Sequence, residues 1–123
     1  MRIETGIDMV SISRIENKFH DNDELLHLIF TDREIENISC KAHKYQSIAG
    51  RWCAKEAFAK ALGTGIGKTV SWRDIEILSD RKGKPIVHIS ESIRDCFEIN
   101  SISLSISHTE DNAIAVIIVV FCG

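Results

Sequence analysis

Three charged side chains in this sequence are spaced so that they could act together on a phosphate group. Glu56 and Lys60 lie four residues apart in an alanine-rich stretch, so a helix would place them on the same face. Asp8 follows an alternating apolar segment near the start of the chain. Mg²⁺ is often bound by one or two carboxylates beside water and substrate phosphate, and a lysine neutralises phosphate oxygens. A surface ion pair between Glu56 and Lys60 is the alternative interpretation, and the helix alone does not decide between the two.

A second group with possible phosphate chemistry, Ser107-His108-Thr109, ends another alternating segment. A histidine at the end of a strand is often structural, so this group gains meaning only if it lies near Asp8 and Glu56. Gly67-Lys68-Thr69 resembles the end of a phosphate-binding P-loop. That motif needs a glycine where this chain has Leu62, and it should follow a strand, whereas a helix is predicted here. We therefore do not expect a P-loop.

The segment that carries Glu56 and Lys60 is predicted to be the longest helix of the chain. It is rich in Ala and Leu, begins near residue 42 and ends before Gly63, a residue type that commonly terminates helices in the left-handed conformation. Earlier in the chain, Thr31 and Glu34 form a capping-box pattern. Alternation and capping residues predict the other elements, which are strands at 2–10, 71–78, 85–89, 102–107 and 113–121 and helices at about 11–19, 21–29, 31–40 and 90–97.

This order of elements places helices between strands that are joined by hairpins. It favours an α+β fold with an antiparallel sheet and a long central helix, in a single domain that spans residues 1–123. Asp8 is expected near the end of the first strand, on the face opposite Ile7 and Met9. The strands at 71–78 and 85–89 are expected to pair as a hairpin.

The composition is that of an ordinary globular protein and argues against several classes of function. A net charge of -3 and a pI near 5.9 disfavour nucleic-acid binding, which usually needs a basic stripe. The apolar run at 113–121 is too short to cross a membrane as a helix, for which about 20 residues are needed. The four cysteines lack metal-binding spacing and no secretion signal is evident. We therefore expect reduced thiols, mostly in the core, and a cytoplasmic location.

Taken in order, the motifs of the chain resemble those of one protein family. They are Gly6-Ile7-Asp8-Met9-Val10, Phe30-Thr31 with Glu34, the block from Gly50 to Gly65, Gly83-Lys84-Pro85, and Leu104-Ser105-Ile106-Ser107-His108. The chain is similar to holo-acyl-carrier-protein synthase, the small bacterial type of 4′-phosphopantetheinyl transferase. The resemblance covers almost the whole chain, and the glycine-bounded block together with the Ser-His pair is its most specific part.

The resemblance implies transfer of the phosphopantetheine arm from coenzyme A to a serine of an apo acyl carrier protein, for fatty acid biosynthesis, with release of adenosine 3′,5′-bisphosphate. Asp8, Glu56 and Lys60 would be the catalytic residues. Of these, Asp8 and Glu56 would hold Mg²⁺ against the pyrophosphate, and Lys60 would lie beside the phosphates. The residues implied to bind the coenzyme are Arg51, Lys60, Gly63, Lys84, Pro85, Ser107, His108 and Thr109.

Because the attacking serine belongs to the carrier protein, this chain needs a proton acceptor and no nucleophile of its own. Glu56 is the candidate, either directly or through a water on the metal. Larger members of the superfamily have a second acid two residues after the first aspartate, where this chain has Val10. A water is expected to fill that place.

The small members of the family are homotrimers with active sites at subunit interfaces, and the resemblance implies the same for this chain. The acidic carrier protein would dock on the helix after Asp8, through Arg14 and Lys18, which lie four residues apart. Arg14 matches the family's pattern, whereas Lys18 is inferred from the spacing, and a solvated helix face is the alternative interpretation of both. Two other functions are to be weighed against transfer: a module that binds the coenzyme without transfer, and a protein that only builds an assembly.

Overall fold

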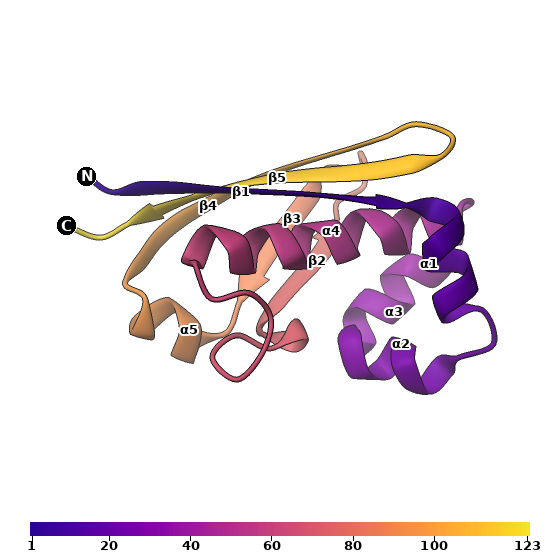
Figure 1. Ribbon diagram of the computed structural model, residues 1–123, viewed down its shortest axis with the longest axis horizontal. Coiled ribbons are helices and arrows are strands. Elements are labelled where there is room, and N and C mark those ends of the chain that lie inside the picture. The colour runs from indigo at the N-terminus through magenta and orange to yellow at the C-terminus, as the bar shows by residue number, and fades with distance from the viewer.

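Helix α4 (Lys44–Leu62) lies across one face of a three-stranded sheet at the centre of the molecule (Figure 1). The computed structural model describes residues 1–123. The other elements are β1 (Ile3–Ser11), α1 (Ile12–Phe19), α2 (Asp23–Ile29), α3 (Asp32–Ser39), η1 (Trp72–Asp74), β2 (Ile75–Ser79), β3 (Pro85–Ile89), α5 (Glu91–Cys96), β4 (Ile99–His108) and β5 (Asn112–Phe121). The main sheet is antiparallel with the strand order β1-β5-β4, and β2 and β3 form a separate hairpin. The predicted α+β class is confirmed.

Two glycines allow α4 to lie directly against the edge strands of the main sheet. A Cβ atom on Gly6 of β1 would lie 1.8 Å from the carbonyl oxygen of Ala57, and one on Gly50 of α4 would lie 2.9 Å from Ile106 of β4. Only a residue without a Cβ permits such close approach. The C-terminal half of α4 is therefore fixed against β1 and its N-terminal half against β4, so the helix runs diagonally beneath the sheet.

We call the face of the main sheet that points away from α4 the outer face, and it is largely apolar over β1 and β5 but carries serines along β4. The residues of β5 that point toward α4 are buried: Ala113, Ala115, Ile117, Val119 and Phe121. The large apolar residues of the outer face are between 38% and 65% exposed, and they are Ile3, Ile7, Met9, Val116 and Ile118. Asp8 lies on the side of β1 opposite Ile7 and Met9, as predicted, and this side faces α4. The apolar side of β1 is thus uncovered in the isolated chain.

The predicted strand at 71–78 is wrong at its start, because regular pairing begins only at Ile75. The preceding residues form the short helix η1, in which the Asp74 carboxylate accepts hydrogen bonds from the Ser71 backbone N–H at 2.8 Å and from the Ser71 hydroxyl at 3.0 Å. This local cap competes with the extended conformation that alternation alone favours. The capping box of Thr31 and Glu34 is confirmed, as is the left-handed Gly63 that ends α4.

The expectation that the cysteines lie mostly in the core is also wrong. All four are free thiols, but only Cys53 is buried. The exposed ones lie at element ends, where the chain leaves the core: Cys40 after α3, Cys96 at the end of α5 and Cys122 after β5.

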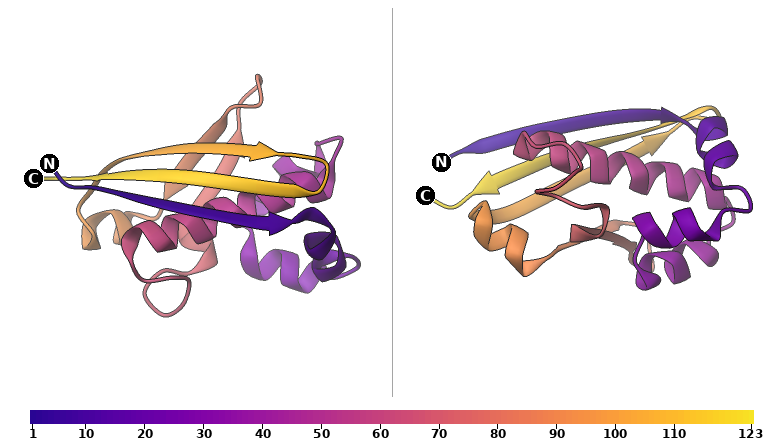
Figure 2. Two further views of the ribbon diagram at one scale, coloured as in Figure 1. Left: turned by 45° about the horizontal axis from the view of Figure 1, so that its top comes forward. Right: turned by 60° about the horizontal axis from the view of Figure 1, so that its bottom comes forward.

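The smaller helices gather at the two ends of α4. Helices α1, α2 and α3 lie together at one end of the molecule and α5 lies at the other, while the β2–β3 hairpin runs at a steep angle to the main sheet (Figure 2). The two chain termini lie close together at the end near α5 (Figure 2). None of the helices combines the length and the apolar content needed to cross a membrane.

Candidate active site

Asp8, Glu56 and Lys60 gather where β1 crosses the C-terminal half of α4, and we call these three residues the carboxylate cluster. The Lys60 ammonium donates to Asp8 Oδ1 at 3.0 Å and to the carbonyl oxygen of Ile7 at 3.0 Å. The Asp8 side chain is 19% exposed and that of Lys60 is 52% exposed, so the cluster opens to solvent. Lys60 forms its ion pair with Asp8 and not with Glu56. The alternative interpretation, a surface ion pair between Glu56 and Lys60 along the helix, is therefore wrong.

Within the carboxylate cluster, the pKa of Glu56 is shifted because its carboxylate is partly buried and lies close to the Asp8 carboxylate. Burial raises the pKa of Glu56 above its ordinary value, the nearby Asp8 carboxylate raises it further, and Lys60 opposes both effects. The thiol of Cys53 lies beneath the cluster, and burial together with the Asp8 charge raises its pKa to about 12. Cys53 is consequently protonated at neutral pH and is no nucleophile.

The donor set of the cluster fits a hard divalent cation. Carboxylate oxygens are preferred ligands of Mg²⁺, and the repulsion between Asp8 and Glu56 would be relieved by a positive charge between them. The chain nowhere gathers three or more His, Cys, Asp or Glu side chains that could hold a metal ion. Asp8 and Glu56 would therefore supply part of a coordination shell, with the remainder left to water and substrate.

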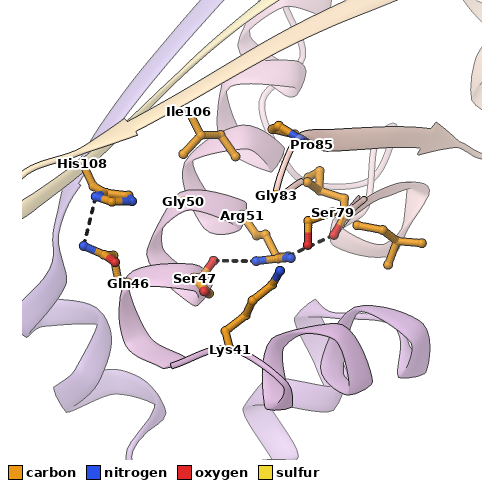
Figure 3. A pocket seen from close by; sticks show the side chains of 12 residues that line it. Lys41, Gln46, Ser47, Gly50, Arg51, Ser79, Gly83, Pro85, Ile106 and His108 are labelled. Carbon is orange, nitrogen blue, oxygen red and sulfur yellow. Dashed lines mark hydrogen bonds between the residues drawn. The ribbon is translucent and has the colours of Figure 1, made fainter. Parts of the chain in front are cut away.

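A cavity of about 260 Å³ opens on the other flank of α4, and we call it the cationic pocket (Figure 3). Its walls come from the N-terminal half of α4, from the β2–β3 hairpin, from β4 and from the segment before α4. It is lined by Lys41, Gln46, Ser47, Gly50, Arg51, Ile77, Leu78, Ser79, Gly83, Pro85, Ile106 and His108. The lining includes Lys41 and Arg51 but no Asp or Glu, so the pocket is suited to an anion.

The guanidinium of Arg51 is fixed at the wall of this pocket by neutral acceptors. Arg51 is 6% exposed, and its Nε donates to the Ile77 carbonyl oxygen at 3.0 Å. Its Nη1 donates to the Ser47 carbonyl oxygen at 3.3 Å, and its Nη2 donates to Asn37 Oδ1. Burial lowers the pKa of Arg51, while the charge of Glu34 acts in the opposite direction. An arginine pKa starts so high that the side chain still carries its charge.

The predicted coenzyme residues do not all meet at one place. Arg51, Pro85 and His108 line the cationic pocket, whereas Lys60 belongs to the carboxylate cluster. Gly63 ends α4 one turn beyond Lys60.

Three further predicted residues lie outside both groups. Ser107 points to the outer face, because its neighbour Ile106 contacts α4 and side chains alternate along a strand. The Thr109 hydroxyl accepts backbone hydrogen bonds inside the β4–β5 turn, and the Lys84 backbone N–H bonds to Asp80 in the hairpin turn. The structure thus separates the expected site into two parts.

Sequence reasoning missed three residues at or behind the cationic pocket. Lys41 lines it from the segment before α4, and Asn37 of α3 bonds to Arg51. The Gln46 side-chain amide donates to Nδ1 of His108 at 3.0 Å, so that the other ring nitrogen is left free (Figure 3). Gln46 lies one helical turn before Gly50, which is the only signal that could have indicated it.

The two residues predicted to dock a partner lie on one exposed helix face. Arg14 and Lys18 are both exposed on α1. The ammonium of Lys18 lies 5.5 Å from the ring centroid of Trp52, at cation–π distance. Lys18 is therefore held against the protein surface.

Comparisons with known proteins agree with one another. A family model described as the 4′-phosphopantetheinyl transferase superfamily matches residues 4–117. The holo-[acyl-carrier-protein] synthase of Chloroherpeton thalassium is 41% identical over 118 residues, which cover 95% of this chain and 97% of that protein. The enzyme of the same name from a Geobacillus species is 46% identical over 122 residues, with 97% of each chain covered.

Solved structures of similar proteins have the same fold. The holo-[acyl-carrier-protein] synthase of Helicobacter pylori in complex with coenzyme A superposes with a TM-score of 0.87 at 41% identity, covering 94% of this chain and 99% of that one. The synthase of Bacillus anthracis in complex with CoA (3′,5′-ADP) superposes with a TM-score of 0.80 at 37% identity, covering 94% of each chain.

Proposed function

The chain belongs to the 4′-phosphopantetheinyl transferase superfamily, and we propose that it moves the 4′-phosphopantetheine group of coenzyme A to a serine of an apo acyl carrier protein. The second product is adenosine 3′,5′-bisphosphate. The observation that carries this proposal is the division of charge along α4. A carboxylate cluster with one lysine lies on one flank and a pocket with two cations and no acid lies on the other.

This division matches the substrate. Coenzyme A has a nucleotide end that bears a phosphate monoester, and a pyrophosphate that joins this end to the pantetheine arm. The acid-free pocket suits the nucleotide end, with Arg51 and Lys41 facing its phosphate and Pro85 and His108 beside the ring system. Lys60 of the carboxylate cluster suits the pyrophosphate, because an ammonium neutralises phosphate oxygens.

The reaction breaks the bond between the pyrophosphate bridging oxygen and the phosphorus that carries the pantetheine arm. The carrier's serine oxygen forms a new bond to that phosphorus, and the bridging oxygen leaves on adenosine 3′,5′-bisphosphate. Glu56 accepts the serine proton, a role favoured by the raised pKa that burial and Asp8 give it. Lys60, oriented by Asp8 and the Ile7 carbonyl, neutralises the leaving phosphate. Asp8 and Glu56 would hold Mg²⁺, which supplies positive charge against the pyrophosphate.

We also propose that the chain acts as a homotrimer in which each active site lies between two subunits. Soluble monomers rarely leave a large apolar patch uncovered, and the outer face of the main sheet has such a patch over β1 and β5. The carboxylate cluster lies at edge strand β1 and the cationic pocket lies at edge strand β4. In a closed ring of copies, the cluster of one subunit can meet the pocket of the next.

We propose the partner and the place of action on separate grounds. Arg14 and Lys18 provide positive charge for an acidic carrier protein on the helix that directly follows β1. The reaction would take place in the cytoplasm and serve fatty acid biosynthesis.

The test is mass spectrometry of an apo acyl carrier protein after incubation with this protein, coenzyme A and Mg²⁺. We expect the carrier to gain the mass of one phosphopantetheine group, and to gain none when EDTA replaces Mg²⁺. A carrier whose acceptor serine is changed to alanine is the control and should stay unmodified. Binding of coenzyme A without a mass gain on any carrier would favour a coenzyme-binding module and contradict the proposal.

A further inference from the structure

Helix α3 carries two polar side chains, Glu34 and Asn37, that reach the same two neighbouring elements. They are three residues apart and so share one face of the helix. Each accepts a hydrogen bond from a cationic side chain of α4 and another from a backbone N–H of β2. The two sets of contacts form successive layers, an inner one around Glu34 and an outer one around Asn37.

The inner layer is a buried and fully compensated ion pair. Glu34 Oε1 accepts from the Lys55 ammonium at 2.8 Å, and Oε2 accepts from the Ile77 backbone N–H at 3.0 Å. Both side chains are 0% exposed. Lys55 also donates to the carbonyl oxygens of Trp72, at 2.7 Å, and of Ile75. The charge of Lys55 is therefore matched by a carboxylate in direct contact.

The outer layer repeats this geometry with one chemical difference. Asn37 Oδ1 accepts from Arg51 Nη2, from the Ser79 backbone N–H at 3.2 Å and from the Ser79 hydroxyl at 3.1 Å. Asn37 thus occupies the place that Glu34 has in the inner layer, but its side chain is neutral. No carboxylate contacts the Arg51 guanidinium, whose three bonds go to an amide oxygen and two carbonyl oxygens.

The surroundings of Arg51 leave its positive charge directed into the cationic pocket. A guanidinium has five N–H donors, and the protein takes up three of them. The ammonium of Lys41 points toward the guanidinium, and no acid lines the pocket (Figure 3). Two cations that face each other without an acid favour an anion between them.

We propose that Asn37 sets the charge of the cationic pocket: it positions Arg51 as a carboxylate would, yet leaves the guanidinium free to bind a phosphate monoester. The inference rests on the proposed function, in which that phosphate belongs to the nucleotide end of coenzyme A. An aspartate at this position would complete a second buried ion pair. The pocket would then lose one net positive charge while Arg51 kept its place.

The test is Asn37→Asp, a nearly isosteric change that keeps the acceptor for Arg51 and Ser79. We expect the KM for coenzyme A to rise about tenfold or more, as for loss of one charge-assisted contact, with kcat unchanged. The effect should be much smaller with 3′-dephospho-coenzyme A, which lacks the phosphate monoester. The melting temperature should not fall, because every hydrogen bond of the outer layer is retained.

The matched control is Asn100→Asp, which adds the same charge at an exposed position of β4 and should leave both KM values unchanged. An unchanged KM for coenzyme A in Asn37→Asp would overturn the inference, and so would an equal rise for both substrates. Calorimetry with adenosine 3′,5′-bisphosphate separates this inference from the proposed function, because it requires no transfer. Weaker binding by Asn37→Asp than by the unchanged protein supports the inference, and equal binding overturns it, whatever the transfer assay gives.

Discussion

The carboxylate cluster and the cationic pocket lie on opposite flanks of the same helix but obtain their electrostatic character in different ways. The cluster combines charged side chains of both signs at a half-exposed crossing of β1 and α4. The pocket combines Lys41 with Arg51, an arginine that is held only by neutral acceptors. The cluster is suited to proton transfer and to a metal ion, and the pocket is suited to recognition of an anion. Under the proposed function, chemistry and binding would therefore be separated along α4.

The largest expected effect tests whether the two regions of one active site come from different chains. Glu56→Gln should lower kcat about a thousandfold, because a general base contributes roughly that much. Lys41→Glu should abolish transfer at low coenzyme A concentration, since it reverses a charge in the pocket. The two variants are then mixed, unfolded and refolded so that they exchange subunits. This treatment should restore about a quarter of the activity, because random assortment pairs an intact cluster with an intact pocket at about one interface in four.

The control for this complementation is the same mixture without subunit exchange, which should show only the residual activity of each variant. If each site were built within one chain, every chain in the mixture would carry one defect. Exchange would then restore no activity, and the shared-site proposal would fail.

The next effect separates the stabilising inner layer from the outer layer behind the pocket. Lys55→Met leaves the Glu34 carboxylate buried without its cation, so we expect the free energy of unfolding to fall by about 3–5 kcal/mol. The double variant with Glu34→Gln should recover part of this loss, because no uncompensated charge is then buried. Urea denaturation measures both. A loss below about 1 kcal/mol for Lys55→Met would contradict the view that Glu34 and Lys55 form a buried, compensated ion pair.

The same contrast explains which parts of the molecule could be predicted from sequence. Glu56 and Lys60 are readable because helical spacing of charged residues shows in the sequence, and Asp8 because strand alternation places it on the face opposite Ile7. The capping box predicted Glu34, but only as a local cap. Its bond to Lys55 depends on how α3 packs against α4, which no local pattern records.

The cationic pocket is harder to predict because it depends on long-range packing and on the absence of acidic side chains from its lining. Lys41 follows no periodic pattern, and the spacing of Asn37 from Glu34 does not show that Asn37 contacts Arg51. The lack of acids around Arg51 appears only once the lining of the pocket is assembled. Ser107 and His108 are neighbours in the predicted phosphate group, but they point to opposite faces of β4 because side chains alternate along a strand. The apolar alternation of β1 predicted the strand correctly and did not reveal that its apolar side is the uncovered one.

A smaller effect concerns how much the carboxylate cluster lowers the stability of the folded protein. Burial and Asp8 raise the pKa of Glu56 above 4.5, so between that pH and the raised value the folded protein holds a proton that the unfolded chain releases. Stability therefore falls as the pH rises through this window and stays lower above it. Glu56→Gln should raise the melting temperature of the metal-free protein at neutral pH, and this gain should disappear below about pH 4.

Thermal melts in EDTA across this pH range measure the difference. Asp8→Asn is the companion variant, and it should also raise the melting temperature at neutral pH, since it removes the repulsion acting on Glu56. A lower melting temperature for Glu56→Gln at neutral pH would show that the Glu56 carboxylate stabilises the fold and that its charge is well solvated.

The smallest effects are expected for helix α1, the proposed docking site of the carrier protein, which lies outside both the carboxylate cluster and the cationic pocket. Arg14→Ala and Lys18→Ala should raise the KM for the carrier protein about twofold to fivefold, the range that corresponds to one exposed charge pair, with the KM for coenzyme A unchanged. Lys18 should give the lesser effect, because its ammonium is already drawn to Trp52. Both effects should shrink at high salt, where exposed charges are screened.

Arg94→Ala on α5, at the far end of the molecule, is the control (Figure 1). Equal carrier KM values in all three variants would place the carrier on another surface, and a change in the coenzyme KM would instead tie α1 to the cationic pocket.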